Sequence, residues 1–184
     1  MIKIEESELL SIIAEIKHGN REAFKKFFSA FQPSVYYFIY RYTCDKEAAE
    51  DLCQETFVKF WLFRNKLDLS SSPKAYLFRI ARNLAFNYLT RKPPVNSYDA
   101  DENLLISISR NPQQDYETYA LVDDLQKALN ILPERCRTTF ILSRYEGLEY
   151  SEIAESMNVS LQTVKNQMNK AITILKKELA EKIN

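Results

Sequence analysis

The stretch from Tyr150 to Lys177 decides the fold and begins Tyr-Ser-Glu-Ile-Ala-Glu-Ser-Met, Asn-Val-Ser, Leu-Gln-Thr-Val-Lys-Asn-Gln-Met-Asn-Lys-Ala. It predicts two short helices joined by a tight turn. We expect Ser151 and Ser160 to cap the two helices, because a serine hydroxyl accepts a free N–H of the first helical turn. Asn158 falls where the chain must turn sharply, and asparagine tolerates a left-handed backbone better than other non-glycine residues.

Both predicted helices are amphipathic. Their inward stripes consist of Ile153, Ala154, Met157, Val159, Val164 and Met168. The outward face of the second helix carries polar side chains with no acid among them: Gln162, Thr163, Lys165, Asn166, Asn169 and Lys170. Such side chains can bond base edges or phosphates. The pattern is therefore that of a helix-turn-helix whose second helix lies in the major groove of DNA.

The composition favours an all-α chain. It has 184 residues, enough for one large domain or two small ones, and 46% of them are hydrophobic, which is ample for a packed core. There are 2 glycines, and strong strand signals and internal repeats are lacking. We expect two small helical domains joined by a flexible linker, with the helix-turn-helix in the C-terminal one.

The formal net charge is zero, but the charges are segregated along the chain. Every charged residue from Leu69 to Tyr98, and again from Ser156 to Lys177, is positive. Acidic residues gather elsewhere, in 5–8, 45–55 and 99–117. This distribution suits a protein that contacts DNA with some faces and a basic protein partner with others.

The 3 cysteines form no C-x-x-C pair, and His18 is the only histidine, so the sequence predicts no metal site and no cofactor. Reduced, buried thiols are typical of a cytoplasmic protein. No apolar run approaches the roughly 20 residues of a membrane span, and we expect no secretion signal.

The sequence pattern predicts a series of helices in the N-terminal half. Apolar residues recur from Leu9 to Ile16, and Asn20 is a plausible cap for the next helix. Phenylalanines then follow at positions 24, 27, 28 and 31, a helical spacing that predicts core side chains rather than a base-stacking platform. We expect Pro33 to begin a further helix, because proline fits a first helical turn.

Two longer helices come next. Asp45 can cap one that runs through Arg64, and Pro73 can open one over Lys74–Arg91, with the serine-rich loop Asp68–Pro73 between them. Residues 95–116 have no sustained period and predict a linker, either ordered only in a complex or a plain tether. Helical periodicity then resumes from position 119, Pro133 opens a helix to about position 145, and Gly147 ends it.

Two separate stretches resemble the bacterial sigma-70 family, in its extracytoplasmic-function (ECF) subfamily. Asp51-Leu52-Cys53-Gln54-Glu55-Thr56-Phe57, ahead of Trp61, is similar to the second-region motif of sigma factors. Similar to their fourth region are Leu132-Pro133, Phe140, Gly147, Tyr150-Ser151-Glu152-Ile153-Ala154 and Thr163-Val164-Lys165. Between these stretches lies Tyr76-Leu77-Phe78-Arg79-Ile80-Ala81-Arg82-Asn83. The resemblance covers nearly the whole chain except the linker.

The resemblance implies a division into residues 1–92 (region 2), 93–117 (linker) and 118–184 (region 4). It implies that core RNA polymerase is contacted by Asp51, Gln54, Glu55, Phe57 and Trp61. It implies that the minus-ten promoter element is read as an unpaired strand by the loop 66–72 and by Leu67, Arg79, Arg82, Asn83 and Asn87. The minus-thirty-five element is read as duplex by Gln162, Thr163, Lys165, Asn166, Asn169 and Lys170.

The partners that the resemblance implies are core polymerase, promoter DNA and an anti-sigma factor, with the free chain a monomer. On residue type alone, Asp51 and Glu55 also fit an ordinary solvated helix face. Two other functions compete: a free-standing helix-turn-helix regulator binding a symmetric operator, and an enzyme on a helical fold. The first leaves the Asp51–Trp61 helix unexplained, and for the second the sequence offers no catalytic constellation or phosphate loop.

Overall fold

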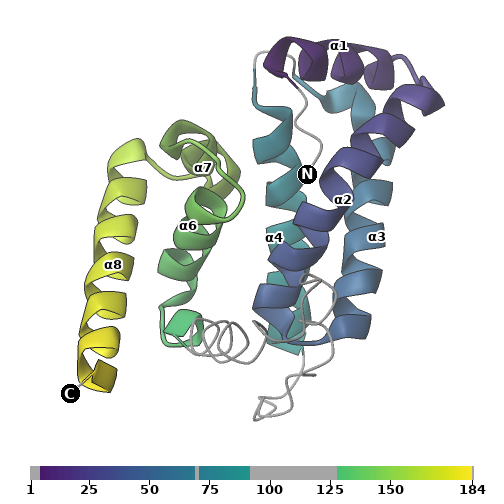
Figure 1. Cartoon of the computed structure of the whole chain (residues 1–184). Helices are drawn as coiled ribbons and strands as arrows, with labels where there is room; N and C mark the ends of the chain where they lie inside the picture. Colours follow the sequence, from purple (N-terminus) through teal and green to yellow (C-terminus); the bar gives the residue numbers. More distant parts are fainter. Residues whose placement is uncertain (1–4, 69–70, 92–127, 184) are drawn as a thin grey trace, which may run out of the picture.

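The computed structural model describes residues 5–68, 71–91 and 128–183, which form α-helices and no strand (Figure 1). The helices are α1 Glu6–Lys17, α2 Arg21–Thr43, α3 Lys46–Leu62, α4 Pro73–Arg91, α6 Glu134–Arg144, α7 Tyr150–Met157 and α8 Leu161–Ile183, with a 3-10 turn η1 at Arg64–Lys66. The all-α prediction is confirmed for these residues. The predicted linker, and the periodic segment that follows it up to residue 127, lie outside them.

The first domain consists of α1–α4, in which α2, α3 and α4 lie side by side and α1 crosses one end (Figure 1). Aromatic residues fill its core, but the prediction from the spacing of four phenylalanines is only partly confirmed: Phe27 is fully buried, Phe24 and Phe31 are half-buried, and Phe28 is 36% exposed. The rings of Phe27 and Phe60 stack with centroids 4.7 Å apart, and Phe38 meets Phe78 edge-on at 5.3 Å. Both members of each pair are fully buried, so α2 is held against both α3 and α4.

Pro33 does not begin a helix, contrary to the prediction; it lies inside the continuous helix α2. A proline there costs about 3 kcal/mol, because it removes one helical hydrogen bond and crowds the preceding turn. Buried residues on both sides of it, from Phe27 to Tyr42, keep the two halves of α2 on one inward stripe. Burial of that stripe offsets the local cost. A contact from α3 lies beside the proline, since the Cys53 thiol donates a hydrogen bond to the Gln32 carbonyl.

The predicted helix starts in this domain are otherwise confirmed. The Asn20 side chain accepts hydrogen bonds from the backbone N–H groups of Glu22 and Ala23, and the Asp45 carboxylate accepts one from Ala48 at 3.0 Å. Pro73 is the first residue of α4, where its missing N–H is harmless. The chain is thus cut into helices where the sequence indicated, apart from the extra break expected at Pro33.

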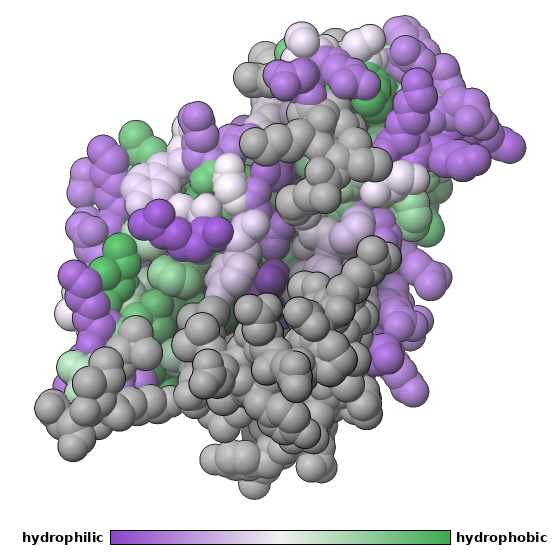
Figure 2. Space-filling view, in the orientation of Figure 1, coloured by the Kyte–Doolittle hydropathy of each residue, from purple (hydrophilic) through white to green (hydrophobic). Residues whose placement is uncertain are grey.

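The second domain contains α6, α7 and α8, and its core is aliphatic (Figure 1). Ile141, Leu142, Ile153 and Val164 are fully buried between the three helices. Apolar side chains fill the space between α6 and α8, whereas hydrophilic ones border the outer edge of α8 (Figure 2). The outer edge of α8 is therefore free to face water or a polar ligand.

Replacement of Phe60 by alanine tests the aromatic core. We expect Phe60→Ala to lower the free energy of unfolding by roughly 3–5 kcal/mol, because it removes a ring that is fully buried against Phe27. Val58→Ala is the matched control on the same helix, since that side chain is 55% exposed; its cost should stay within about 0.5 kcal/mol. Urea denaturation followed by circular dichroism measures both, and equal losses would contradict this account of the core.

Candidate nucleic-acid and partner interfaces

The helix-turn-helix forms as predicted, with one correction at its start. Asn158 ends α7 in the left-handed conformation with φ 53°, and the Ser160 hydroxyl accepts a hydrogen bond from the Thr163 N–H at 3.1 Å. Ser151, however, does not cap α7. The helix begins at Tyr150, two residues earlier than a Ser151 cap would place its start, and Glu149 and Glu152 cap it reciprocally through side chain and backbone.

The two faces of α8 divide as the sequence predicted. Val164 and Met168 are buried. Of the six predicted DNA-binding residues, Thr163 is half-buried and the others are exposed: Gln162, Lys165, Asn166, Asn169 and Lys170. The Gln162 amide donates to the Asn166 side-chain oxygen at 3.0 Å, so neighbouring turns present a linked pair of amides. Gln167 lies outside this group, because it accepts a hydrogen bond from Thr139 of α6.

A second exposed polar surface lies on α3. Asp51, Gln54 and Glu55 are all exposed, and Glu55 forms an ion pair with Lys59 at 3.0 Å one turn further on. We call Asp51, Gln54 and Glu55 the α3 ridge. An exposed pair of this kind contributes little to stability, so the ridge is available for a partner.

The two aromatic residues expected to contact a partner beside this ridge differ in position. Phe57 is only 2% exposed, and its ring meets that of fully buried Phe27 edge-on, with centroids 6.3 Å apart. The prediction that the Phe57 side chain contacts a partner is therefore corrected. Phe57 lies on the buried stripe of α3, on the opposite side of the helix from the α3 ridge. Trp61 is half-buried, with the Arg64 guanidinium 4.5 Å above its ring, and keeps an accessible edge.

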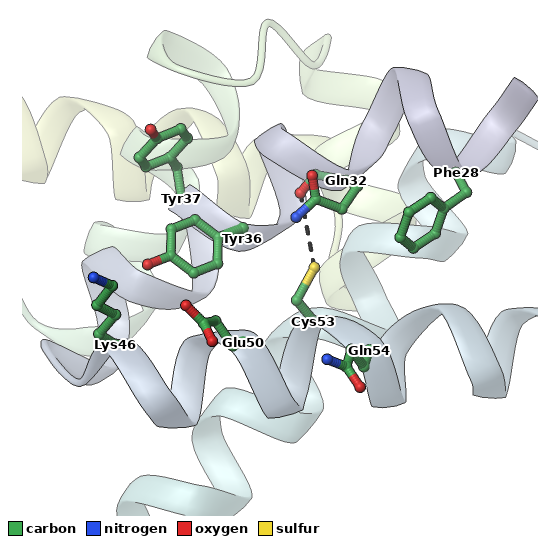
Figure 3. Close-up of a pocket in the computed structure, with 8 residues that line it drawn as sticks. All are labelled: Phe28, Gln32, Tyr36, Tyr37, Lys46, Glu50, Cys53 and Gln54. Carbon is green, nitrogen blue, oxygen red and sulfur yellow. Dashed lines mark hydrogen bonds between the residues drawn. The ribbon is translucent and has the colours of Figure 1, made fainter. Parts of the chain in front are cut away.

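A cavity of about 460 Å³ opens between α2 and α3 beside the ridge (Figure 3). Its lining consists of Phe28, Gln32, Tyr36, Tyr37, Lys46, Glu50, Cys53 and Gln54. The Tyr36 hydroxyl is buried and has no hydrogen-bond partner among the described residues. Burial, and then the nearby Glu50 carboxylate, raise the pKa of Tyr36 to about 12, so the hydroxyl keeps its proton. Sequence reasoning missed this cavity, because it needs the pairing of two helices.

The residues predicted to read an unpaired strand lie mostly on one side of α4. Asn83 and Asn87 are exposed, Arg79 lies 4.9 Å over the Tyr76 ring, and the Arg82 guanidinium donates to the Asn83 side chain at 2.8 Å. Sequence reasoning did not single out Phe86, which is 45% exposed on the turn that links Asn83 to Asn87.

Leu67 is the exception in this group. Its side chain is 4% exposed, and its carbonyl accepts a hydrogen bond from the Lys17 ammonium at 2.8 Å. The prediction of a direct DNA contact by this side chain is therefore wrong in this arrangement. Leu67 instead anchors the start of the loop that leads to α4.

The two domains touch where α4 meets α7, an arrangement that no sequence pattern indicated (Figure 1). Ser72 donates from its hydroxyl to Glu152 at 2.6 Å and from its N–H to Glu155 at 3.3 Å. Lys74 donates to the backbone carbonyl of Glu146. These partners lie 72 to 83 residues apart in the chain, so only the folded structure reveals them.

A deeper pair of contacts joins α2 to the second domain. Arg41 and Glu146 form an ion pair at 3.4 Å, and the hydroxyls of Tyr42 and Thr138 share a buried hydrogen bond. Burial raises the pKa of Glu146 to about 7, although Arg41, a hydrogen bond from Ser34 and Lys74 all lower it. Desolvation therefore outweighs the neighbouring positive charges at this carboxyl.

Within the described part of the chain, no group of three or more His, Cys, Asp or Glu side chains could hold a metal ion. No helix in that part is long and apolar enough to cross a membrane. Burial raises the pKa of Cys53 to about 12, so its thiol is unreactive.

A helix-turn-helix whose second helix exposes a polar face without acidic side chains is the arrangement of a DNA-binding protein. Comparisons with known proteins specify the class. A family model described as Sigma-70 region 2 matches residues 27–93, and one described as Sigma-70, region 4 matches residues 123–175.

The chain is 26% identical to the ECF RNA polymerase sigma factor SigW of Bacillus subtilis, covering 92% of this chain and 95% of that protein. It is 32% identical to the ECF RNA polymerase sigma factor SigE of Mycolicibacterium smegmatis, covering 80% of this chain and 58% of that one. Among solved structures, CnrH in complex with the cytosolic domain of CnrY is similar in fold, with a TM-score of 0.73, 18% identity, and 94% and 97% of the two chains covered. The chain belongs to the ECF group of the sigma-70 family, whose members direct promoter-specific initiation of transcription.

The raised pKa of Glu146 predicts that acid stabilises the contact between the domains. The pKa of the Glu146 carboxyl is 4.5 in the unfolded chain and about 7 in the folded chain, so the folded state binds the proton more tightly. The contribution of this residue to the free energy of unfolding is therefore largest below pH 4.5 and is lost as the pH rises to about 7. At roughly 1.4 kcal/mol per pKa unit, the loss amounts to about 3 kcal/mol.

Glu146→Gln should remove this dependence. The difference in free energy of unfolding between the native chain and Glu146→Gln should therefore change by about 3 kcal/mol between pH 4.5 and about 7. The contributions of all other titrating groups are the same in both chains and cancel in this difference. Glu178→Gln, on α8, is the control and should run parallel to the native chain. A constant difference between the native chain and Glu146→Gln would show that the carboxyl does not titrate in this range.

Proposed function

We propose that this sigma factor binds core RNA polymerase through the α3 ridge. The observation that carries the proposal is that Asp51, Gln54 and Glu55 are exposed together on α3, while the other side of that helix is buried in the aromatic core. An acidic and amide-bearing ridge suits a partner helix that carries arginine, since desolvated charge pairs fix register and specificity. A free-standing DNA regulator has no use for such a surface.

The cavity between α2 and α3 extends this interface. Its Glu50 carboxylate and unpartnered Tyr36 hydroxyl can accept hydrogen bonds, and its Phe28 ring gives an apolar wall (Figure 3). A long side chain with a cationic end fits this combination, because its stem is apolar and its head can donate. A polymerase or anti-sigma segment that lies along the α3 ridge would place such a side chain there.

The minus-ten element is read as a single strand by the loop 66–72 and by α4. Arg79 and Arg82 supply positive charge for phosphates, and exposed Asn83 and Asn87 can bond base edges. Exposed Phe86 lies among them and offers a ring face on which an unpaired base can stack. Leu67 holds the loop in place instead of contacting DNA.

The minus-thirty-five element is read as duplex by the first turns of α8. Lys165 and Lys170 contact phosphates, and the amides of Gln162, Asn166 and Asn169 face base edges, with Thr163 beside them. The chain acts as an initiation factor and not as an enzyme, since opening a few base pairs requires only binding energy. It works in the cytoplasm, where it meets RNA polymerase, and an anti-sigma factor is its third partner.

Replacement of Lys165 by alanine tests the phosphate role. We expect the holoenzyme to bind all promoter sequences more weakly by a similar factor, and the slope of log affinity against log salt to fall by about one. Fluorescence anisotropy at several salt concentrations measures both quantities. Glu178→Ala, further along α8, is the control and should leave the slope unchanged. A Lys165→Ala slope equal to that of the native chain would refute the phosphate contact.

Replacement of Asp51 and Gln54 by alanine tests the α3 ridge. Each change should weaken the binding of core polymerase by roughly 1–3 kcal/mol, as expected for truncated polar groups at the centre of an interface. Competition binding with a labelled sigma factor measures the loss. Glu8→Ala removes an exposed acid from α1 and should have no effect. Full affinity in both ridge variants would move the polymerase interface elsewhere.

A further inference from the structure

Basic side chains gather at the end of the first domain where α1 passes into α2, an end at which hydrophilic residues dominate the surface (Figure 2). The Lys17 ammonium there donates a hydrogen bond at 2.8 Å to the carbonyl of Leu67, 50 residues away in the chain. The Arg64 guanidinium lies against Gly19, where a Cβ atom would come within 3.9 Å of its Nε and Nη2 atoms. We call the side chains that these contacts bring together the η1 patch: Lys17, Arg21, Phe63, Arg64 and Lys66.

The positive charges of the η1 patch are not neutralised by neighbouring acids. Segments 17–26 and 59–67 carry four and three basic residues respectively, against one acid, Glu22. Among the residues that the structure describes, no ion pair involves a cation of the patch. Of the acids that border these segments, Glu15 accepts a hydrogen bond from the Asn20 side chain at 2.7 Å, and Asp68 is exposed. The patch therefore keeps a net positive charge that attracts an anion.

Aromatic rings lie between these cations. Phe63 is 44% exposed, and the Lys66 ammonium lies 5.2 Å from the centre of its ring. The Arg64 guanidinium covers the Trp61 ring at 4.5 Å, and its buried Nε atom has no hydrogen-bond partner among the described residues. Rings interleaved with cations are typical of surfaces that bind single strands, because bases stack on the rings while the cations attract phosphates. A duplex, whose bases are already stacked on one another, would leave the Phe63 ring unused.

The η1 patch lies close to the surface proposed to read the minus-ten element. Lys66 and Leu67 precede α4, which begins at Pro73, and the chain from Leu67 to Pro73 spans at most about 20 Å. From Pro73 to Asn83 the helix is only about 15 Å long. Even at the duplex spacing of about 3.4 Å per nucleotide, roughly ten nucleotides cover both distances. One strand can therefore contact Asn83 and the patch together.

Only one side of the minus-ten element can supply an unpaired strand of this length. Between the two promoter elements the DNA is duplex, since α8 reads the minus-thirty-five element in a major groove. The opened strand continues on the other side, toward the start of transcription. A surface beyond the first residue of α4 that attracts phosphates and stacks bases therefore suits the strand downstream of the minus-ten element.

We propose that the η1 patch binds the unpaired strand immediately downstream of the minus-ten element, with phosphates held by its cations and a base stacked on Phe63. The inference rests on the proposed role of α4 in minus-ten binding and adds a contact that the promoter sequence does not specify. Phosphate contacts and ring stacking tolerate any base. The patch thus stabilises the opened promoter without changing which promoters are chosen.

Fork-shaped promoter DNA tests the proposal with the holoenzyme formed from the full chain and core polymerase. The promoter is one that this holoenzyme selects from a random-sequence library, and its duplex ends in an unpaired non-template tail. A short tail stops at the end of the minus-ten element, and a long tail runs about six nucleotides further downstream, a length typical of single-strand sites. Fluorescence anisotropy measures both affinities, and their ratio is the gain from the added strand. Contacts of core polymerase with the tail are common to all variants and cancel when gains are compared.

Stacking and phosphate binding have separate readouts. We expect Phe63→Ala to reduce the gain at least about fivefold, the lower end of the effect of one stacked base. Phe63→Tyr should retain the gain, because the aromatic face remains. Lys66→Ala should lower the slope of log affinity against log salt by about 0.7 on the long tail only, the value for one phosphate contact to a single strand. Lys66→Arg should restore that slope.

The controls match each change in chemistry. Leu62→Ala removes an apolar side chain that is 63% exposed beside Phe63 but has no ring. Lys176→Ala removes an exposed lysine from α8. Neither should alter the gain, or the difference in salt slope between the two tails. Circular dichroism verifies that every variant is folded.

The contrary outcomes are distinct. Folded Phe63→Ala and Lys66→Ala variants that keep the full gain and salt slope would overturn the inference. Equal losses on both tails, or weaker binding of core polymerase without DNA, would assign the patch to the polymerase and overturn it as well. Arg79→Ala and Asn83→Ala on the short tail test the proposed function separately. If neither weakens binding, the minus-ten role of α4 fails; if both do while the patch variants keep the gain, only the inference fails.

Discussion

The burial of aromatic rings between α2 and α3 is the constraint on which the first domain depends. The stacked pair Phe27 and Phe60, with Phe57 beside it, fixes which side of α3 faces inward. Since an α-helix has 3.6 residues per turn, this choice also fixes which side faces water. The α3 ridge of Asp51, Gln54 and Glu55 is the direct result. The buried stripe and the α3 ridge thus lie on opposite faces of one helix, so a core substitution that rotates α3 would also displace the ridge.

The second domain follows the same logic with aliphatic residues. Val164 and Met168 set the rotation of α8, and the left-handed Asn158 sets the angle at which α8 leaves α7. The amides and lysines of its first turns then project outward without any acid among them. In both domains the exposed polar surface is the complement of a buried stripe, so one helix can both pack in the core and present polar side chains to a partner.

Helical periodicity made most of the fold predictable, and its failures have physical causes. The sequence predicts a break at Pro33 on local grounds alone, whereas burial on both sides of it keeps α2 continuous. Serine is the better cap by type, yet Glu149 caps α7 because Glu152 can reciprocate. Phe57 and Leu67 were predicted as contacts from their place in a motif, but a motif position does not reveal burial. Contacts such as Ser72 with Glu152, 80 residues apart, leave no periodic signal at all.

The contact between the domains has two parts. At its edge the hydrogen bonds from Ser72 and Lys74 to the second domain are partly buried, and burial lowers the pKa of the Lys74 ammonium. The buried groups Glu146, Arg41, Tyr42 and Thr138 behave differently, because separation returns them to water and relieves the desolvation that raises the pKa of Glu146. The two domains are therefore joined by a contact whose centre contains a carboxyl with a strongly raised pKa, so the pH of the solution acts on the contact itself.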